Sequence, residues 1–223
     1  MGQKIIFGDD VGKLLESCDL ESKLRETGRQ IIAGVDEAGR GPLAGPVVAA
    51  AVILPDSGMI PGLDDSKKLS AARRDILFDR IVTSGAEYAV GIVDNEMIDR
   101  INILRASLRA MAQAVCKLSK KPDFVMVDGN QPIPNLELAQ ATIVGGDAIC
   151  PSISAASIIA KVTRDRIMDH YDKLYADFSF SKHKGYPTAE HLDQLKTYGV
   201  TPIHRKSFKP VAEALSRAEL TLA

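Results

Sequence analysis

A nearly uninterrupted run of apolar residues from Val47 to Leu54 constrains the fold more than any other feature of the sequence. Such a run is typical of a strand buried on both faces, which requires helices packed against both sides of its sheet. A second apolar stretch, Ile31 to Asp36, comes shortly before it. The glycines and prolines between the two stretches predict a hairpin with a wide connecting loop.

Strand and helix patterns alternate along the rest of the chain. Further strands are predicted at residues 87–93, 124–128 and 141–145. Helices are predicted at residues 9–26, 70–83, 94–118 and 152–175, from 188 and around 210. The helix at 70–83 is expected to bury a stripe formed by Ile76, Leu77, Ile81 and Val82. We therefore predict an α/β fold: a mixed five-stranded sheet flanked by helices, with extra C-terminal helices.

Length and cysteine content limit the class of protein. The 223 residues suit one domain with terminal additions, which we divide into an N-terminal accessory helix at 1–28 and a main domain at 29–223. Three cysteines are too few and too scattered for a disulfide framework or a zinc site. No segment has the apolar pattern of a signal peptide or a membrane span. We expect a cytoplasmic, monomeric protein with no membrane partner.

The net charge of −1 conceals a basic segment near the C-terminus. Residues 178–210 contain six lysines and arginines against two acidic residues, so this segment carries a charge of +4. We consider Lys182, Lys184, Arg205 and Lys206 candidates for phosphate contacts. Lys161, Arg164 and Arg166 are interspersed with acids in the predicted helix 152–175, where ion pairs between residues four apart are expected.

Acidic residues follow three of the predicted strands. Asp36 and Glu37 end the first, Asp128 ends the one at 124–128, and Asp147 follows the last. Each by itself is typical of a helix cap or a turn, but together they could meet at one edge of the sheet. Two carboxylates about 4 Å apart repel each other by roughly 4 kcal/mol at an effective dielectric constant of about 20. Such a cluster needs protons or a cation, and its oxygen ligands suit Mg²⁺ or Mn²⁺ better than zinc.

A glycine-rich segment, Gly39 to Gly45, follows the first strand. Its spacing is not that of the dinucleotide-binding motif, the chain has no phosphate-binding G-K-[ST] motif, and the two preceding acids would repel a phosphate. Glycine also permits close approach of the backbone to a ligand. An arginine between two glycines suits contact with a sugar-phosphate backbone.

The chain resembles the bacterial ribonuclease HII family over residues 31–210. The resemblance rests on residues 35–47 (VDEAGRGPLAGPV), 65–70 (DSKKLS), 127–129 (VDG), 146–147 (GD), 155–162 (AASIIAKV) and 183–186 (HKGY), in the order of the family. It implies a ribonuclease H-like fold and an endonuclease that cleaves the RNA strand of RNA/DNA hybrids. It also implies cleavage 5′ to single ribonucleotides embedded in duplex DNA, leaving 3′-hydroxyl and 5′-phosphate ends.

The same resemblance assigns roles to individual residues. It implies that two ions, Mn²⁺ or Mg²⁺, are bound by the metal-binding and catalytic carboxylates Asp36, Glu37, Asp128 and Asp147. It implies substrate contacts from Gly39, Arg40 and Gly41 to the 2′-hydroxyl, from Tyr186 to the neighbouring sugar, and from Ser66, Lys67 and Lys184. Some members of the family bind a sliding clamp through a C-terminal motif, but the tail after Pro210 has no aromatic residue. Clamp binding is not expected.

Two alternatives remain beside this interpretation. A catalytically silent hybrid-binding module on the same fold would have no use for four carboxylates facing phosphates. Another nuclease of the same superfold would cleave all-DNA junctions. Zinc ligation by the clustered histidines is not expected, because their spacing is wrong and no cysteine is near; His183 and His204 are expected to contact backbone or solvent.

Overall fold

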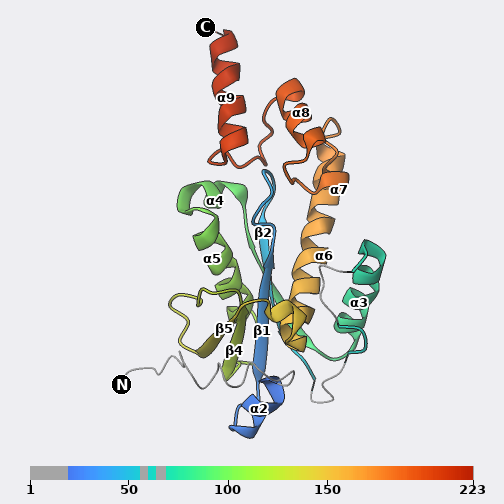
Figure 1. Cartoon of the computed structure of the whole chain (residues 1–223), viewed down its shortest axis with the longest axis vertical. Coiled ribbons are helices and arrows are strands. Elements are labelled where there is room, and N and C mark those ends of the chain that lie inside the picture. The colour runs from blue at the N-terminus through green and yellow to red at the C-terminus, as the bar shows by residue number, and fades with distance from the viewer. Residues whose placement is uncertain (1–19, 56–59, 64–68, 223) are drawn as a thin grey trace.

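The computed structural model describes residues 20–55, 60–63 and 69–222, and its centre is a five-stranded mixed sheet (Figure 1). Its strands are β1 (Ile32–Ala38), β2 (Val47–Ile53), β3 (Glu87–Val93), β4 (Phe124–Asp128) and β5 (Ala139–Ile143). Their order across the sheet is β3-β2-β1-β4-β5. The strands β1, β2 and β3 pair antiparallel, whereas β4 runs parallel to both β1 and β5. The predicted mixed five-stranded α/β fold is confirmed.

Helices cover both faces of this sheet, as the buried run in β2 predicts. On one face lie α4 (Asn95–Ile101) and α5 (Ile103–Cys116), and on the other lie α3 (Ala71–Thr83) and the long α6 (Pro151–Leu174). Alternate residues of β2 serve the two sides: Ala49 and Ala51 pack with α5, while Ala50 and Val52 pack with α6 and α3. The small alanines let both helix layers approach the same strand closely.

A smaller C-terminal part extends beyond one end of the sheet (Figure 1). It consists of α7 (Phe180–His183), α8 (Ala189–Tyr198) and α9 (Lys209–Leu222). Its buried aromatic and aliphatic side chains pack against the loop between β1 and β2: Ala44 joins the cluster of Phe178 and Phe180, and Leu43 joins that of Leu195. The C-terminal helices therefore support the glycine-rich segment. The four-residue helix α7 is not predicted from the sequence.

The structure corrects three local predictions. The helix predicted through 94–118 is two helices, because Asn102 has a φ of 69° and its side chain caps α5 by accepting from the N–H of Arg105. In α3 only Leu77 and Ile81 are buried; Ile76 and Val82 are 47% and 37% exposed because one helix side alone faces α6. The last strand lies at 139–143 rather than 141–145, in register with β4 from Ala139 onward.

The predicted N-terminal helix at 9–26 falls partly outside the described residues. The described part is α2 (Leu20–Glu26), where Leu20 and Leu24 are buried against β1, β4 and α6. The side chain of Glu21 accepts a hydrogen bond of 2.9 Å from the N–H of Ser152 near the start of α6. Among the described residues, no helix has the length and apolar character needed to cross a membrane.

Candidate active site

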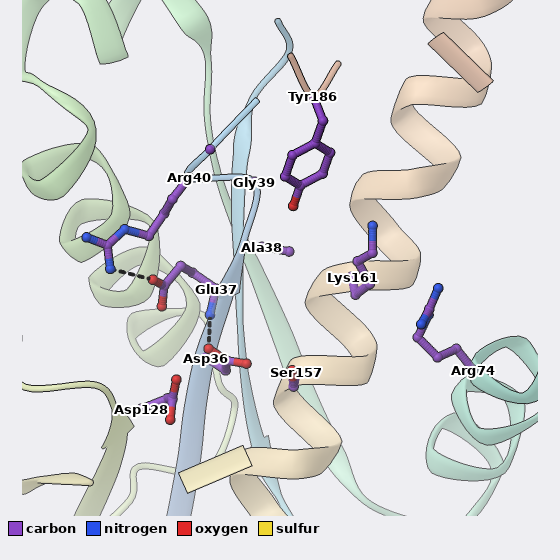
Figure 2. A pocket seen from close by; sticks show the side chains of 11 residues that line it. Asp36, Glu37, Ala38, Gly39, Arg40, Arg74, Asp128, Ser157, Lys161 and Tyr186 are labelled. Atoms are coloured by element: carbon purple, nitrogen blue, oxygen red, sulfur yellow. Dashed lines mark hydrogen bonds and ion pairs between the residues drawn. The ribbon is translucent and has the colours of Figure 1, made fainter. Parts of the chain in front are cut away.

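Two acidic residues meet because β1 and β4 are parallel neighbours that end at the same level. The last registered pair is Val35 with Val127, and Asp36 and Asp128 each follow one residue later. Val35 and Val127 point into the α5 side of the core, so the alternation of a strand sends the next side chain toward α6. The Glu37 side chain points the other way, toward Arg40, and Figure 2 shows the carboxylates of Asp36, Glu37 and Asp128 close together at the ends of β1 and β4.

Asp36 is the most buried of these three carboxylates, with 5% exposure. One of its oxygens accepts a 2.7 Å hydrogen bond from the N–H of Glu37, and Ser157 on α6 also hydrogen-bonds to it. Burial raises the pKa of Asp36 well above its usual value, and the negative charges of Glu37 and Asp128 raise it further. The charged form of Asp36 is therefore stable only when a positive group neutralises the cluster.

Glu37 is in a similar state but has a cation nearby. Burial raises its pKa, and Arg40, whose Nη1 lies 3.1 Å from the Glu37 Oε1, opposes that rise. The guanidinium of Arg40 is more than half exposed, so it can leave this ion pair for a phosphate at modest cost. Figure 2 marks the pair with a dashed line.

The fourth predicted carboxylate lies beside this group rather than in the cleft wall. Asp147 belongs to the short 3₁₀ helix η2 (Gly146–Ala148) and is 2% exposed. The preceding residue, Gly146, donates its N–H to Asp128 Oδ1 at 2.8 Å, which places η2 directly against Asp128. The structure thus brings Asp36, Glu37 and Asp128 around one cleft, whereas Asp147 lies on η2, next to Asp128, and does not line that cleft.

The cleft has a volume of about 400 Å³ and an acidic and a basic side (Figure 2). Opposite the carboxylates lie Arg74 from α3 and Lys161 from α6, and the rest of its lining is Ala38, Gly39, Arg40, Gly41, Ser157 and Tyr186. Sequence reasoning missed Arg74, Ser157 and Lys161 as site residues. The signal for two of them was present, because Ser157 and Lys161 are four residues apart in the motif 155–162 and so share one face of a helix.

The ion pairs predicted for α6 are only partly confirmed. Lys161 Nζ does lie 2.6 Å from Asp165 Oδ1, although burial lowers the pKa of this lysine. Arg166 instead reaches Asp75 on α3 at 3.4 Å. Arg164 is fully buried, and its guanidinium donates to the carbonyl oxygens of Ala44, Pro46 and Lys184. It is a structural donor to backbone rather than a member of a helix-surface ion pair.

The glycine-rich segment and Tyr186 form the rim between the two sides. Gly39 has a φ of +97°, and a Cβ at this position would collide with the Arg164 side chain, so only glycine fits. A Cβ on Gly41 would lie 3.5 Å from the ring of Tyr186, which is 40% exposed. The Tyr186 carbonyl is held by His191 Nδ1 at 2.9 Å. A flat, partly exposed ring is thus presented next to two glycines.

The basic segment does not present all its charges to the cleft. Arg205, a predicted phosphate contact, is fully buried and donates to four backbone carbonyls; this prediction is wrong because the segment runs beneath the glycine-rich loop. Lys184 forms an ion pair with Asp169, Lys182 forms one with Glu190, and Lys206 is exposed. Ser66 and Lys67 lie outside the described residues.

The histidines form a buried stack rather than a ligand group. His183 stacks on His191 with ring centroids 4.2 Å apart, and His191 Nε2 lies 3.0 Å from His204 Nε2. The predicted backbone contacts are present, since His183 Nδ1 accepts from the N–H of Gly185 and His204 Nδ1 from that of Thr201. Contact with solvent is absent, because the rings of His183, His191 and His204 are buried. Burial lowers the pKa of His191 to about 4 and that of His204 to about 3.

The chemistry of the acidic side suits a hard divalent cation. Within the described residues, no three acidic, histidine or cysteine side chains already form a group able to hold a metal ion. The donors that converge are nevertheless all carboxylates, with one buried member whose charge is unfavourable without a cation. Oxygen donors with this charge match Mg²⁺ or Mn²⁺, and no thiol or imidazole lines the cleft, in the part of the chain described, to favour zinc.

Comparison with known proteins gives consistent matches. A family model for Ribonuclease HII matches residues 33–211. Ribonuclease HII of Geobacter sulfurreducens is 54% identical over 200 residues, covering 90% of this chain and 92% of that protein. The crystal structure of ribonuclease H2 from Pyrococcus horikoshii superposes with a TM-score of 0.71 at 29% identity, covering 85% and 99% of the two chains. The ribonuclease HII in the structure of the PCNA:RNase HII complex from Archaeoglobus fulgidus gives a TM-score of 0.69 at 27% identity, covering 80% and 95%.

Proposed function

Because the chain belongs to the ribonuclease HII family, we propose that it cleaves phosphodiester bonds 5′ to single ribonucleotides embedded in duplex DNA as well as within RNA/DNA hybrids. It is a ribonuclease H endonuclease that acts on RNA/DNA hybrids and depends on a divalent metal. The observation that carries the finer proposal is the meeting of Asp36, Glu37 and Asp128 in one cleft with the Gly39-Arg40-Gly41 segment and Tyr186 on its rim.

The carboxylates are proposed to hold two divalent ions, Mg²⁺ or Mn²⁺. Asp36, Glu37 and Asp128 would contribute from the cleft wall, and Asp147 from η2, next to Asp128. When bound, such ions lower the pKa of the attacking water and neutralise charge on the leaving oxygen. The protein's own part is to fix the ligands: Gly146 N–H and Glu37 N–H each hold one carboxylate oxygen, of Asp128 and Asp36 respectively, in place.

The rim is proposed to select the ribonucleotide. Two glycines let the backbone approach a sugar, and the 2′-hydroxyl is the group by which RNA differs from DNA at a given site. The Tyr186 ring, whose centroid lies 6.0 Å from Lys161 Nζ, would stack on the neighbouring sugar. Arg40, whose exposed guanidinium pairs with the nearby Glu37, would exchange that partner for a phosphate.

Cations around the cleft are proposed to hold the phosphates of the two strands. Arg74 and Lys161 face the carboxylates across the cleft. A sugar-phosphate backbone bound in the cleft would therefore contact the proposed metal ions on one side and the guanidinium of Arg74 and the ammonium of Lys161 on the other. Lys184 lies near this rim but is engaged by Asp169, so its phosphate contact would require the release of that ion pair. Ser66 and Lys67 are proposed as substrate contacts on the family resemblance alone.

The remaining parts of the proposal concern organisation and partners. We propose a cytoplasmic monomer whose catalytic domain spans residues 29–223, with 1–28 as an accessory segment. Burial of Leu20 and Leu24 against the main core supports docking of the end of that segment. Binding of a sliding clamp is not proposed: the Archaeoglobus protein forms a complex with PCNA, but the tail of this chain after Pro210 has no aromatic residue.

Side-by-side cleavage of three labelled substrates tests this function. They are a duplex DNA with one ribonucleotide, a long RNA/DNA hybrid, and an all-DNA duplex with a junction, each incubated with the protein and Mg²⁺ or Mn²⁺. We expect cleavage of the first two and none of the third. Binding without cleavage by folded protein would favour a catalytically silent hybrid-binding module, and cleavage of the junction would favour another type of nuclease.

A further inference from the structure

The loop from Gly39 to Pro46, which we call the recognition loop, rests on two fully buried arginines. Arg164 comes from α6, and Arg205 comes from the segment between α8 and α9. Burying a guanidinium costs free energy unless each of its N–H donors has a hydrogen-bond partner. Packing alone therefore does not explain why these two arginines are buried. Burial lowers the pKa of Arg205 to about 9, and the nearby charge of Arg164 contributes to that decrease.

Arg205 satisfies its donors with carbonyls from both ends of the recognition loop. Its Nη2 donates to the Gly39 oxygen at 2.6 Å and to the Pro46 oxygen at 3.2 Å. Its Nη1 donates to the Arg40 oxygen at 3.0 Å, and its Nε to the Gly45 oxygen at 3.0 Å. One planar group therefore closes the loop upon itself, which a lysine with a single nitrogen could not do.

These bonds also determine where the loop's N–H groups point. In a planar trans peptide the carbonyl and the N–H of the next residue point in opposite directions. None of the described peptide bonds is cis. Because Arg205 draws the Gly39 and Arg40 carbonyls toward itself, the N–H groups of Arg40 and Gly41 are turned away from it. Gly39, Arg40 and Gly41 line the cleft, so N–H groups turned away from Arg205 are placed to donate into it.

The segment that carries Arg205 is itself anchored to the helix layer. The N–H of Arg205 donates to the Leu43 carbonyl at 2.8 Å. The carboxylate of Asp99 on α4 accepts from the N–H groups of Lys206 and Ser207, each at 2.9 Å. These bonds fix the backbone on both sides of the guanidinium, so its position relative to the recognition loop is set by the fold rather than by substrate.

We propose that Arg205 is a positioning residue for ribonucleotide discrimination, because it orients the Arg40 and Gly41 N–H groups toward the cleft from beneath the recognition loop. This inference rests on the proposed function of that loop. The C-terminal segment would then take part in substrate selection without contacting the substrate. Loss of the four carbonyl contacts should let the two peptide planes rotate and weaken contact with the 2′-hydroxyl.

Equilibrium binding without metal tests this inference. The dissociation constants of wild-type protein for a duplex DNA with one ribonucleotide and for the same all-DNA duplex are measured in EDTA by fluorescence anisotropy. Their ratio is the discrimination ratio. We expect Arg205→Lys to reduce it about tenfold, because two hydrogen bonds to the ribonucleotide are weakened, while affinity for the all-DNA duplex changes little. The matched control Arg217→Lys changes an exposed arginine of α9 and should leave the ratio unchanged.

The outcomes separate the two proposals. A wild-type ratio of one contradicts ribonucleotide recognition by the rim and overturns the inference, whereas the proposed function fails only if the ribonucleotide-containing duplex is not cleaved with metal. A wild-type preference that Arg205→Lys keeps, in protein shown by circular dichroism to be folded, overturns the role of Arg205 alone. If Arg205→Lys does not fold, Asp99→Ala takes its place, since it releases the neighbouring backbone without emptying the core. We expect it to lower the ratio about threefold, and an unchanged ratio would overturn the inference.

Discussion

Asp36 illustrates, at the scale of one residue, how this molecule prepares for a metal. Its carboxylate is buried beside two other acids, and its pKa is raised by burial first and by their charges second. A group with a raised folded pKa stabilises the native state below its unfolded pKa, and this contribution is lost as the pH rises through the folded value. At neutral pH Asp36 therefore lowers the stability of the metal-free protein, and cation binding reverses the deficit.

Replacing Asp36 by Asn should separate function from stability. The amide keeps the shape and removes the buried charge, so we expect cleavage to fall by at least about a thousandfold while the thermal midpoint of the metal-free protein rises. For a protein of this size the midpoint moves by roughly 2–4 °C per kcal/mol. Single-turnover cleavage and calorimetry check the two parts. If hybrid binding is unchanged but the thermal midpoint of Asp36→Asn is lower than that of wild type, the buried charge of Asp36 does not destabilise the metal-free protein.

Tyr186 allows a narrower prediction about substrate contact. Tyr186→Ala should lower kcat/KM at a single ribonucleotide about tenfold, because the ring's contact with the neighbouring sugar is lost, which corresponds to about 1.4 kcal/mol of transition-state stabilisation. The metal concentration for half-maximal cleavage should not move, since the ring does not join the carboxylates. Tyr198→Ala, which removes an exposed tyrosine of α8 outside the cleft, is the matched control. Equal kinetic effects of the two changes would remove the stacking role.

At the scale of elements, the sequence predicted the strands and the meeting of their acids better than it predicted helix boundaries and faces. Strand ends carrying Asp36 and Asp128 are visible as apolar runs that stop at an acid, and the parallel pairing of β1 with β4 then places them together. The break at Asn102 has no periodic signal, because it depends on one residue adopting a positive φ. Arg74 was missed for another reason: only the packing of α3 against α6 brings it to the cleft.

The contact between β1 and α6 gives a prediction at this scale. A Cβ on Gly34 would collide with backbone atoms of Ser152 and Ile153 at the start of α6. Gly34→Ala should therefore cost about 1–3 kcal/mol or more of unfolding free energy, and it should lower cleavage because Ser157 would shift away from Asp36.

Gly28→Ala provides the comparison for that change. Gly28 has a φ of +92°, and a Cβ added there would have no atom within 4 Å, so this change introduces backbone strain alone, worth about 1–2 kcal/mol. Urea unfolding of both variants measures the difference. If Gly34→Ala lowers the free energy of unfolding less than Gly28→Ala does, α6 moves away from β1 without a free-energy cost.

At the scale of the whole molecule, the catalytic sheet and the C-terminal helices act together through buried polar groups. Arg205 and His191 both reach backbone oxygens of the rim, from a segment whose charge suggested only a surface for phosphate. Sequence alone could not have revealed this, because a lysine- and histidine-rich stretch looks the same whether its side chains point outward or inward. The burial of Arg164 was hidden in the same way by the acids around it in sequence.

The buried histidines predict how stability depends on pH. The folded pKa of His204 is depressed to about 3 against an unfolded value of about 6.5, so its contribution is fully present above the unfolded value and is lost as the pH falls toward the folded one. The stability difference between wild type and His204→Gln should shrink by up to about 1.4 kcal/mol per pH unit between about pH 6.5 and 4. Urea unfolding across this range measures it. A difference independent of pH would mean that His204 is charged in the native state.

The most direct test of metal-dependent ribonucleotide cleavage is mapping the cut in a duplex DNA that contains one ribonucleotide. With Mg²⁺ or Mn²⁺, wild-type protein should make a single cut 5′ to the ribonucleotide and leave 3′-hydroxyl and 5′-phosphate ends. EDTA or the Asp128→Asn change should abolish the cut while the protein remains folded. Cleavage that survives EDTA, or an intact duplex in the presence of folded wild-type protein and metal, would contradict this function.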